Sequence, residues 1–317
     1  MNLSVIIPNY NGEEILQKNL PKILDSLVHY EKGEIEVIVP DDASTDKSLR
    51  VLEDFKKKIS ATYPKIKFTI VNNHKNCGFS SNVNSGVRRA NGDILILLNT
   101  DVIPGKNFLV PLLSHFSDPN IFAVGCMDES AEKDKRIFRG RGIGLWRKGF
   151  LIHSRGDINK TNTLWVSGGS GAFRKSIWNK LGGLNSLYDP FYWEDIDLSY
   201  RALKSGYQIL FDPESLVVHE HEKGAIKKKF TASQVKSIAY RNQFIFVWKN
   251  VTDFDITFSH LLWLPYHFAK AILRRDLEFF KGFFSAFLLF PVVIKYRLQD
   301  QKLFTKKDKE VISEFIK

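Results

Sequence analysis

Residues 93–101, with the sequence DILILLNTD, decide how this chain is expected to fold. Five apolar residues follow Asp93, and a short run of this kind is typical of a strand that is buried on both faces. The run ends abruptly in Asn99, Thr100 and Asp101. Ligands of open parallel sheets bind just beyond the carboxyl ends of the strands, so Asn99 and Asp101 are candidate site residues. The alternative is an ordinary loop acid or helix cap ahead of Pro104.

Similar apolar runs precede this stretch, at residues 3–8, 35–40 and 66–72. Helix-like segments separate the runs, at residues 13–28, 46–60 and 79–90. In the first of these, Leu16, Leu20 and Ile23 give an apolar face at helical spacing. This alternation predicts right-handed crossovers and an α/β fold, in which a mostly parallel central sheet is flanked by helices and has a cleft at the strand ends.

Each predicted strand delivers polar or turn residues at its carboxyl end. The four segments are PNYNG at 8–12, DDAS at 41–44, residues 72–78 and NTD at 99–101. One such end would be ordinary loop chemistry, but four on the same edge predict a binding site. Neither GxGxxG after the first strand nor GxxxxGK[ST] is present, so a dinucleotide dehydrogenase or a P-loop enzyme is not expected.

Length and composition fit a globular protein of one large or two smaller domains, with 317 residues and a net charge of +11. Most of that charge lies after Glu222. Two cysteines, Cys77 and Cys126, are too few for a disulfide framework or a cysteine-rich zinc site. Because the first apolar run begins at Leu3, no signal peptide is expected before it, and we expect a cytoplasmic protein.

Residues 135–155 are basic, aromatic and punctuated by glycine. They fit either a solvated hairpin or a loop on the acceptor side of the site, where rings and cations suit sugar faces and lipid phosphates. No recognised nucleic-acid module accompanies these cations, so nucleic acid is not an expected partner.

Residues 166–174 predict a strand crowded with glycines, which is costly unless a ligand must approach the backbone closely. The segment FYWEDID at 191–197 then places three rings before three carboxylates. On a helix that begins near Glu194, Asp197 and Arg201 stand four residues apart and are expected to form a structural pair. Carboxylates in the first turn, such as Glu194, can simply compensate the helix dipole.

Taken together, these segments resemble family 2 glycosyltransferases with the GT-A fold, which is Rossmann-like. The resemblance covers roughly residues 2–220, and the motifs that carry it are PNYNG, DDASTD at 41–46, the Asn76-x-Gly78-x-x-x-Asn82-x-x-x-Gly86 segment and NTD. It is similar in pattern to rhamnosyl- and galactofuranosyl-type transferases of cell-surface polysaccharide synthesis. The resemblance implies an inverting transfer of a sugar from a nucleotide diphosphate, UDP or dTDP above all, to a hydroxyl of a glycan that we expect to be lipid-linked.

The resemblance also implies roles for single residues on the donor side. Pro8, Tyr10 and Asp41 would contact the nucleoside, and Asp101 would hold a divalent metal, Mg²⁺ or Mn²⁺. Such a hard cation with oxygen ligands neutralises charge on a departing diphosphate. Asn99 departs from the usual first Asp of the family motif, so it would reach the ribose or the metal only weakly.

On the acceptor side, Asp195 matches the catalytic base of the family, with Gly169, Trp193 and Glu194 near the sugar or the acceptor. Relatives that use a metal-binding histidine place it at the end of the strand expected over residues 208–219. His219 is the preferred ligand, and His221, on the same strand face, is the alternative.

From Lys223 the composition changes to a basic helical stretch through Asn250, followed by segments rich in Phe, Leu and Trp and a short amphipathic helix at 305–317. The longest charge-free run, 282–294, contains Pro291 and is shorter than the ~20 apolar residues that cross a bilayer. Basic and apolar groups together favour helices that lie on the inner face of the cell membrane. Packing on the catalytic domain or on a second subunit is the alternative. The expected division is therefore a GT-A domain at 1–222 and a helical region at 223–317.

Two rival functions make different predictions. A sugar nucleotidyltransferase shares a similar architecture but would need a basic glycine-rich loop after the first strand, and PNYNG is not one. A non-catalytic nucleotide-binding or membrane-surface module would bind the donor without turnover.

Overall fold

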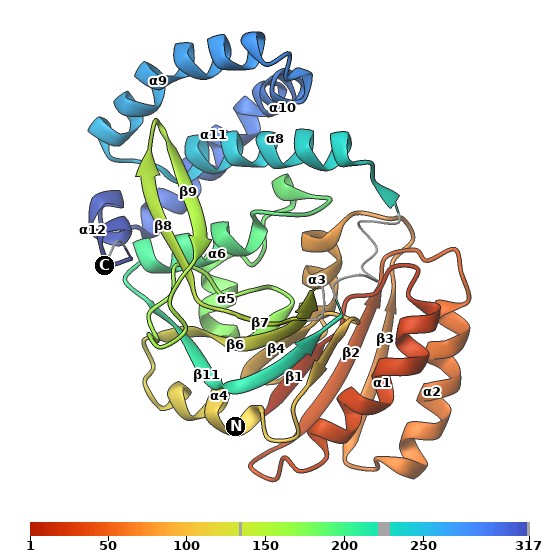
Figure 1. Ribbon diagram of the computed structural model, residues 1–317. Coiled ribbons are helices and arrows are strands. Elements are labelled where there is room, and N and C mark those ends of the chain that lie inside the picture. Colours follow the sequence, from red (N-terminus) through yellow and green to blue (C-terminus); the bar gives the residue numbers. More distant parts are fainter. Residues whose placement is uncertain (133–134, 221–228, 316–317) are drawn as a thin grey trace.

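The structure is a computed structural model that describes residues 1–132, 135–220 and 229–315. Its centre is a mixed sheet in which the strand order is β3-β2-β1-β4-β10-β6-β11-β5, with β7 paired to β6 (Figure 1). Helices cover both faces, as expected for an α/β fold. The elements of the first half are β1 (Leu3–Ile6), α1 (Glu13–Leu27), β2 (Ile35–Asp41), α2 (Ser48–Thr62), β3 (Ile66–Asn72), α3 (Phe79–Val87) and β4 (Ile94–Leu98).

The first four strands are parallel, and their bounds agree with the sequence prediction to within a few residues. Val5 of β1 lies opposite Val37 of β2 and Ile96 of β4. Successive side chains of a strand point to opposite faces, and here they enter two separate cores: Val5 packs with the α1 side, whereas Ile6 packs with α3 and the later elements. The buried, apolar strands thus hold their polar carboxyl ends at one edge.

The second half of the sheet is mixed because it combines parallel and antiparallel pairs, and one strand runs against both of its neighbours. This strand is β10 (Ser170–Arg174), which lies antiparallel between β4 and β6 (Ile121–Glu132). It begins four residues later than the predicted 166–174 strand. Strand β11 (Gln208–His219) runs parallel to β6. Its end pairs antiparallel with β5 (Val102–Pro104), a three-residue strand that the sequence did not predict.

The remaining elements of the catalytic part cover the sheet or extend from it. They are α4 (Leu109–Ser114), β7 (Lys135–Arg139), the hairpin of β8 (Gly142–Arg147) and β9 (Phe150–Arg155), α5 (Lys175–Leu181) and α6 (Glu194–Lys204). Helix α6 begins at the predicted residue. The β8–β9 hairpin rises from the sheet toward the C-terminal helices (Figure 1).

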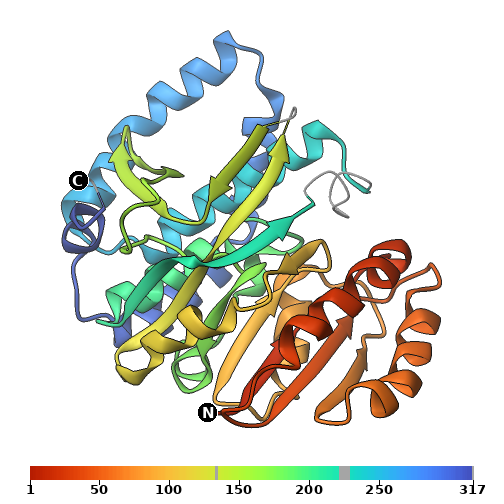
Figure 2. The same cartoon turned by 60° about the horizontal axis from the view of Figure 1, so that its bottom comes forward.

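The C-terminal helices are α8 (Ala232–Asn250), α9 (Phe254–Leu273), α10 (Leu277–Leu288), α11 (Phe290–Asp300) and α12 (Asp308–Ser313). Helix α8 lies across the catalytic part, and α9 forms an outer edge of the molecule, where it contacts the β8–β9 hairpin (Figures 1 and 2). Trp193, Phe244 and Phe246 belong to one continuous core. The C-terminal region therefore packs on the catalytic part, and the predicted boundary at 222/223 falls outside the described residues.

Within the described ranges, no single helix is both long and apolar enough to cross a membrane. The bent pair Leu277–Leu288 and Phe290–Leu303, which meets at 63°, reaches the required length and composition only when its two helices are counted together.

Candidate active site

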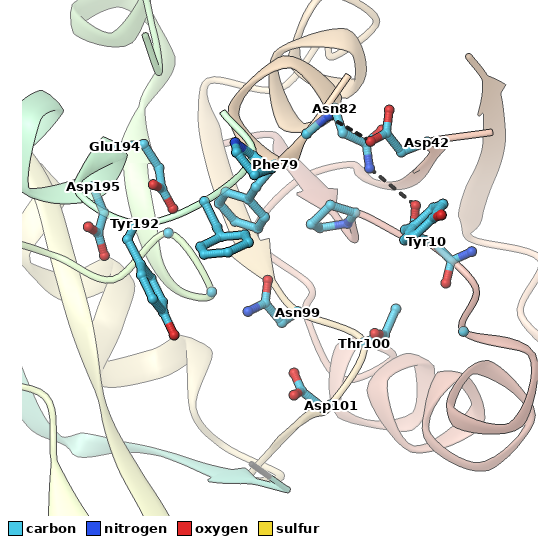
Figure 3. Close-up of a pocket in the computed structure, with 18 of the residues that line it drawn as sticks. Tyr10, Asp42, Phe79, Asn82, Asn99, Thr100, Asp101, Tyr192, Glu194 and Asp195 are labelled. Carbon is cyan, nitrogen blue, oxygen red and sulfur yellow. Dashed lines mark hydrogen bonds between the residues drawn. The ribbon is translucent and has the colours of Figure 1, made fainter. Parts of the chain in front are cut away.

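A cavity of about 750 Å³ opens at the carboxyl ends of the first strands (Figure 3). Tyr10 and Asp42 lie at one end, Glu194 and Asp195 at the other, and Asn99 and Asp101 lie between them. The sequence-predicted residues that line it are Pro8, Tyr10, Asn99, Asp101, Gly169, Glu194, Asp195 and His219. Segments that are far apart in the chain thus meet in one site. Two predicted residues, Asp41 and Trp193, are not part of the lining.

Asp41 does not line the cavity, so its predicted contact with the nucleoside stays a prediction. Its carboxylate is fully buried and accepts hydrogen bonds from Asn9 Nδ2 at 2.7 Å and from the Ser44 backbone N–H at 2.8 Å. Asp42 lines the cavity instead, where it accepts the N–H groups of Cys77 and Gly78 at 2.9 Å each. Asp41 shapes the loop, and its neighbour reaches the ligand space.

Several residues of the nucleotide end were not singled out from the sequence. Lys229 holds its Nζ 4.4 Å from the Tyr10 ring centroid and 3.0 Å from Asn76 Oδ1. Phe79 lies within the glycine- and asparagine-spaced segment and also lines the cavity. The spacing of that segment was a usable signal for Phe79, whereas Lys229 comes from a distant part of the chain that no local pattern connects to Tyr10.

The structure explains the glycine at position 169 by a contact within the protein, whereas the sequence suggested close approach of a ligand. A Cβ on this residue would lie 2.4 Å from Asn99 Nδ2, and its carbonyl accepts the Asn99 N–H at 2.9 Å. The group that approaches the Gly169 backbone is therefore the Asn99 side chain. Close contact with a donor sugar at Gly169 stays a prediction.

Asp101 and His219 are brought together by the pairing of β5 with β11. Val102 lies opposite His219, which places Asp101 Oδ1 3.3 Å from His219 Nε2. The other ring nitrogen, Nδ1, lies 2.7 Å from Asp128 Oδ2 on β6. Burial alone would lower the pKa of His219, but hydrogen bonds and charge from Asp101 and Asp128 raise it to about 9. His221 lies outside the described residues.

In the part of the chain that the structure describes, no group of three or more histidine, cysteine or carboxylate side chains is placed to hold a metal ion. Asp101 and His219 are thus a pair of possible ligands, and Asp128 lies on the far nitrogen of the histidine ring.

Asp195 stands in the first turn of α6. Burial raises the pKa of Asp195 to about 6, although the N–H groups of Ile196 and Gly168 donate to the carboxylate and oppose the shift. Part of the side chain remains open to the cavity. Burial and the charge of Asp195 raise the pKa of Glu194 well above its usual value. This end of the site holds a carboxylate that is poised for proton transfer near neutral pH.

Asp197 has the structural role that the sequence predicted. It pairs with Arg201 at 2.8 Å and also accepts hydrogen bonds from Lys249 at 2.8 Å, Asn250 at 2.8 Å and the Tyr188 hydroxyl at 2.9 Å. Burial would raise the pKa of Asp197, but the charges of Lys249 and Arg201 hold it well below its usual range. A fully buried, four-partner carboxylate of this kind is not available to a substrate.

Tyr192, not Trp193, presents its ring to the cavity. Trp193 is buried and packs against His153 and Phe246, with ring centroids 5.1 Å apart in each pair. Tyr192 is 44% exposed and lines the cavity beside Glu194 (Figure 3). From the basic 135–155 segment, Arg139 and Arg155 also reach the cavity lining.

Comparison with known proteins agrees with this architecture. A model of "Glycosyl transferase family 2" matches residues 4–182, more than half of the chain. The chain therefore belongs to glycosyltransferase family 2, and its nucleotide-sugar transferase fold is GT-A.

Curated relatives support the same family. The chain is 29% identical over 217 residues to the probable glycosyltransferase YdaM of Bacillus subtilis (strain 168), a match that covers 68% of this chain and 49% of YdaM. It is 33% identical over 244 residues to the Methanococcus voltae dolichyl N-acetyl-alpha-D-glucosaminyl phosphate 3-beta-D-2,3-diacetamido-2,3-dideoxy-beta-D-glucuronosyltransferase, covering 71% of this chain and 68% of that protein. The chain thus spans about half the length of YdaM.

Among solved structures, mannosyltransferase PcManGT from Pyrobaculum calidifontis, in complex with GDP-Man and Mn²⁺, has a TM-score of 0.55 at 17% identity. The match covers 95% of this chain and 83% of that chain, so the shared GT-A fold extends through most of the described molecule.

Proposed function

We propose that this glycosyltransferase inverts the anomeric carbon as it moves a sugar from a nucleotide diphosphate to a hydroxyl group, with Asp195 as the base. The observation that carries the proposal is the partly open Asp195 carboxylate, whose pKa burial raises to about 6, at the end of the cavity opposite Tyr10 (Figure 3). A sugar between these ends would expose its anomeric carbon to an acceptor that Asp195 deprotonates. Attack from the face opposite the diphosphate inverts the carbon in one step.

The donor end would hold the nucleoside through shape and fixed polar groups. Tyr10 and Phe79 offer ring faces, Asp42 offers a carboxylate whose geometry two backbone N–H groups fix, and Lys229 places a cation beside Tyr10. Lys229 would attract the negative charge of a nucleotide. UDP or dTDP is the proposed carrier, with GDP as the comparison because PcManGT was solved with GDP-Man.

Asp101 and His219 would hold Mg²⁺ or Mn²⁺, and the residues fit such an ion. Two ligands at ~2.1 Å from an octahedral ion lie about 3 Å apart, close to the 3.3 Å between Asp101 Oδ1 and His219 Nε2. Asp128 on Nδ1 matches the carboxylate that orients many metal-binding histidines. When bound, the ion would neutralise charge on the diphosphate. With only two protein ligands, most of its coordination would come from donor oxygens and water.

We further propose that the acceptor is a lipid-linked glycan and that the protein lies on the inner face of the cell membrane. Helices α9 to α11 expose apolar side chains with few neighbours to cover them: Phe254, Leu261, Leu262, Ile272, Leu273, Leu277, Phe284, Phe287, Leu288 and Leu298. Lys270, Lys281 and Lys295 lie on the same helices, and Arg274 and Arg275 lie in the turn between α9 and α10. Helices that lie on a membrane surface insert apolar side chains between the lipids and use Lys and Arg to bind anionic headgroups. The Methanococcus voltae relative, named for a dolichyl phosphate acceptor, supports this proposal.

The test is turnover with a panel of UDP-, dTDP- and GDP-sugars in Mg²⁺ or Mn²⁺, scored by nucleotide diphosphate release with and without lipid-linked sugar acceptors. Transfer that yields the opposite anomeric configuration to the donor supports the proposal. Retention of configuration, or tight donor binding with no release of nucleotide under any condition, would contradict it and favour the non-catalytic alternative. Formation of a nucleotide-sugar from a sugar phosphate and a nucleoside triphosphate, with release of pyrophosphate, would favour a nucleotidyltransferase.

A further inference from the structure

Helix α8 belongs to the C-terminal region, yet it contacts the chain on both sides of the Glu194-Asp195 pair. Asn242 contacts the segment before the pair, Phe246 packs against Trp193, and Lys249 contacts Asp197 after it. Positions four and seven residues after Asn242 lie on the same face of a helix. One face of α8 therefore contacts the chain on both sides of Asp195, from Tyr188 to Asp197.

The contact before the pair is a buried amide that serves several carbonyl groups. Asn242 is fully buried, and its Nδ2 lies 3.1 Å from Tyr188 O, 2.9 Å from Phe191 O and 2.8 Å from Tyr192 O. The neighbouring Arg241 guanidinium also donates to the carbonyl groups of Tyr188 and Asp189. Buried carbonyls without such donors would be costly, so this segment depends on α8 for its hydrogen bonds.

The segment that these bonds hold has an unusual backbone. Tyr192 has φ 71° and Trp193 has φ 76°, both in the left-handed region that aromatic residues rarely adopt. Conformations of this kind persist only where the surroundings enforce them. The two residues end directly at Glu194, where α6 begins and where Asp195 enters the cavity.

The contact after the pair is ionic. Lys249 and Asn250, at the end of α8, both donate to Asp197 Oδ1 at 2.8 Å. Both α8 residues are fully buried, as is Asp197. Asp197 lies two residues beyond Asp195 on α6. The first turn of α6 therefore contacts α8 through Asp197, and the segment that precedes this turn contacts α8 through Asn242.

We propose that Asn242 is a positioning residue for sugar transfer: it holds the carbonyl groups of residues 188–192 so that the Asp195 carboxylate points into the cavity. The inference rests on the proposed function of Asp195 as the base. Asn242 itself touches no substrate. It follows that the C-terminal region contributes to the rate of transfer in addition to any contact it makes with a membrane.

The experiment compares full-length Asn242→Ala with the wild-type protein and with Val293→Ala. Val293 is fully buried on α11, so its truncation loosens the C-terminal packing without removing a hydrogen bond to residues 188–192. We expect kcat of Asn242→Ala to fall by about ten- to hundredfold, the range expected from a small misplacement of a catalytic group, with donor affinity unchanged. Val293→Ala should keep kcat near the wild-type value.

The pH profile separates positioning from simple loss of folded protein. Glu194 and the N–H groups of Gly168 and Ile196 face Asp195, and the substitution changes none of them. Burial raises the pKa of Asp195 to about 6, so we expect the acid limb of wild-type transfer near pH 6. If the loosened segment admits water to Asp195, this limb should move to lower pH, because burial causes the raised pKa. A smaller folded fraction would lower the rate at every pH and leave the limb in place.

Wild-type kcat in Asn242→Ala, or an equal loss in Val293→Ala with an unshifted acid limb, would overturn the inference. Should Asn242→Ala fail to fold, Arg241→Met removes the outer donors of the same segment from a partly exposed position, and it must then lower kcat and shift the limb in the same direction. Asp195→Asn is measured alongside. If it retains turnover, the assignment of the base fails, whatever Asn242→Ala shows; if it is inactive while Asn242→Ala and Arg241→Met turn over normally, only the positioning role fails.

Discussion

The two ends of the cavity are built from the same kinds of side chain but by different parts of the fold. At the nucleotide end, strand ends of the parallel half-sheet place Asp41 and Asp42, and hydrogen bonds from Asn9, Ser44 and backbone N–H groups fix both carboxylates. At the acceptor end, Glu194 and Asp195 enter on a helix start where burial raises both pKa values. The first end is arranged for shape and binding, and the second holds a carboxylate able to accept a proton.

The largest effect is expected from removal of the divalent ion. Chelation with excess EDTA should abolish transfer, since the donor diphosphate would lose its counter-charge. Asp101→Ala should weaken donor binding in Mn²⁺ more than in its absence, measured by calorimetry. Asp118→Ala is the matched control, because Asp118 is a loop carboxylate outside the cavity lining. Full activity in excess EDTA would show that neither end depends on a metal.

The next effect is on the pH dependence of transfer. Asp195 must be ionised to accept a proton, so the rate should fall about tenfold for each pH unit below pH 6. Donor binding measured over the same range should not follow that limb, because the nucleotide end does not include Asp195. If donor binding and the transfer rate fell together over the same pH range, the two ends of the cavity would not act separately.

A smaller, surface effect should appear when the exposed apolar face of α9 and α10 is made polar. Phe254, Leu273 and Leu288 are each more than 80% exposed, at 83%, 84% and 81%. Their replacement by Ser should weaken binding to anionic vesicles in a sedimentation assay, and salt should only weaken binding of the wild-type protein. Val110→Ser on α4, where Val110 is 67% exposed, should bind as the wild type does. Equal sedimentation of all variants would reject membrane contact through this face.

Surface substitutions test membrane contact more directly than deletion of the C-terminal region would. Because Phe244 and Phe246 share a core with Trp193, a chain ending near Glu222 would expose that core and would test folding in place of membrane binding.

The smallest effect is a gain in stability. Folding raises the pKa of Asp195 from 3.8 to about 6, so the ionised carboxylate is less favourable in the folded protein and stability is lost as pH rises through 6. Asp195→Asn cannot ionise and should be more stable at pH 8 by about 1 to 2 kcal/mol, allowing for partial exposure. The gain should vanish near pH 4 in thermal or urea unfolding. Destabilisation at pH 8 would mean that the carboxylate is held by favourable contacts, as at the nucleotide end.

Much of the first half of the fold could be predicted from the sequence, because the spacing of apolar residues and the length of each apolar run indicate which segments are buried strands or helices. The four parallel strands, the start of α6 and the Asp197–Arg201 pair were all accessible in this way. Which of two adjacent residues faces a cavity was harder. The sequence motifs point to Asp41 and Trp193, whereas their neighbours Asp42 and Tyr192 line the cavity. Which neighbour faces a cavity depends on local backbone angles, and the positive φ angles of Tyr192 and Trp193 cannot be predicted from residue type.

Long-range pairings had no local signal at all. Strand β5 is three residues long, below what periodicity can detect, yet its pairing with β11 brings Asp101 to His219. Asn242 and Lys249 lie in a helix that mixes polar, aliphatic and aromatic residues, and their contacts with residues 188–197 span about fifty positions.

The most direct test of the central claim compares Asp195→Asn with Asp197→Asn, measuring the transfer rate and the donor dissociation constant for each protein at pH 7.5. Asp195→Asn preserves shape but removes the proton acceptor, so transfer should fall by about 10² to 10⁴ while donor affinity is retained. Asp197→Asn should act through stability, because its buried partners Lys249 and Arg201 would then share Asp300 as a single counter-charge. Near-native turnover in Asp195→Asn would contradict the account.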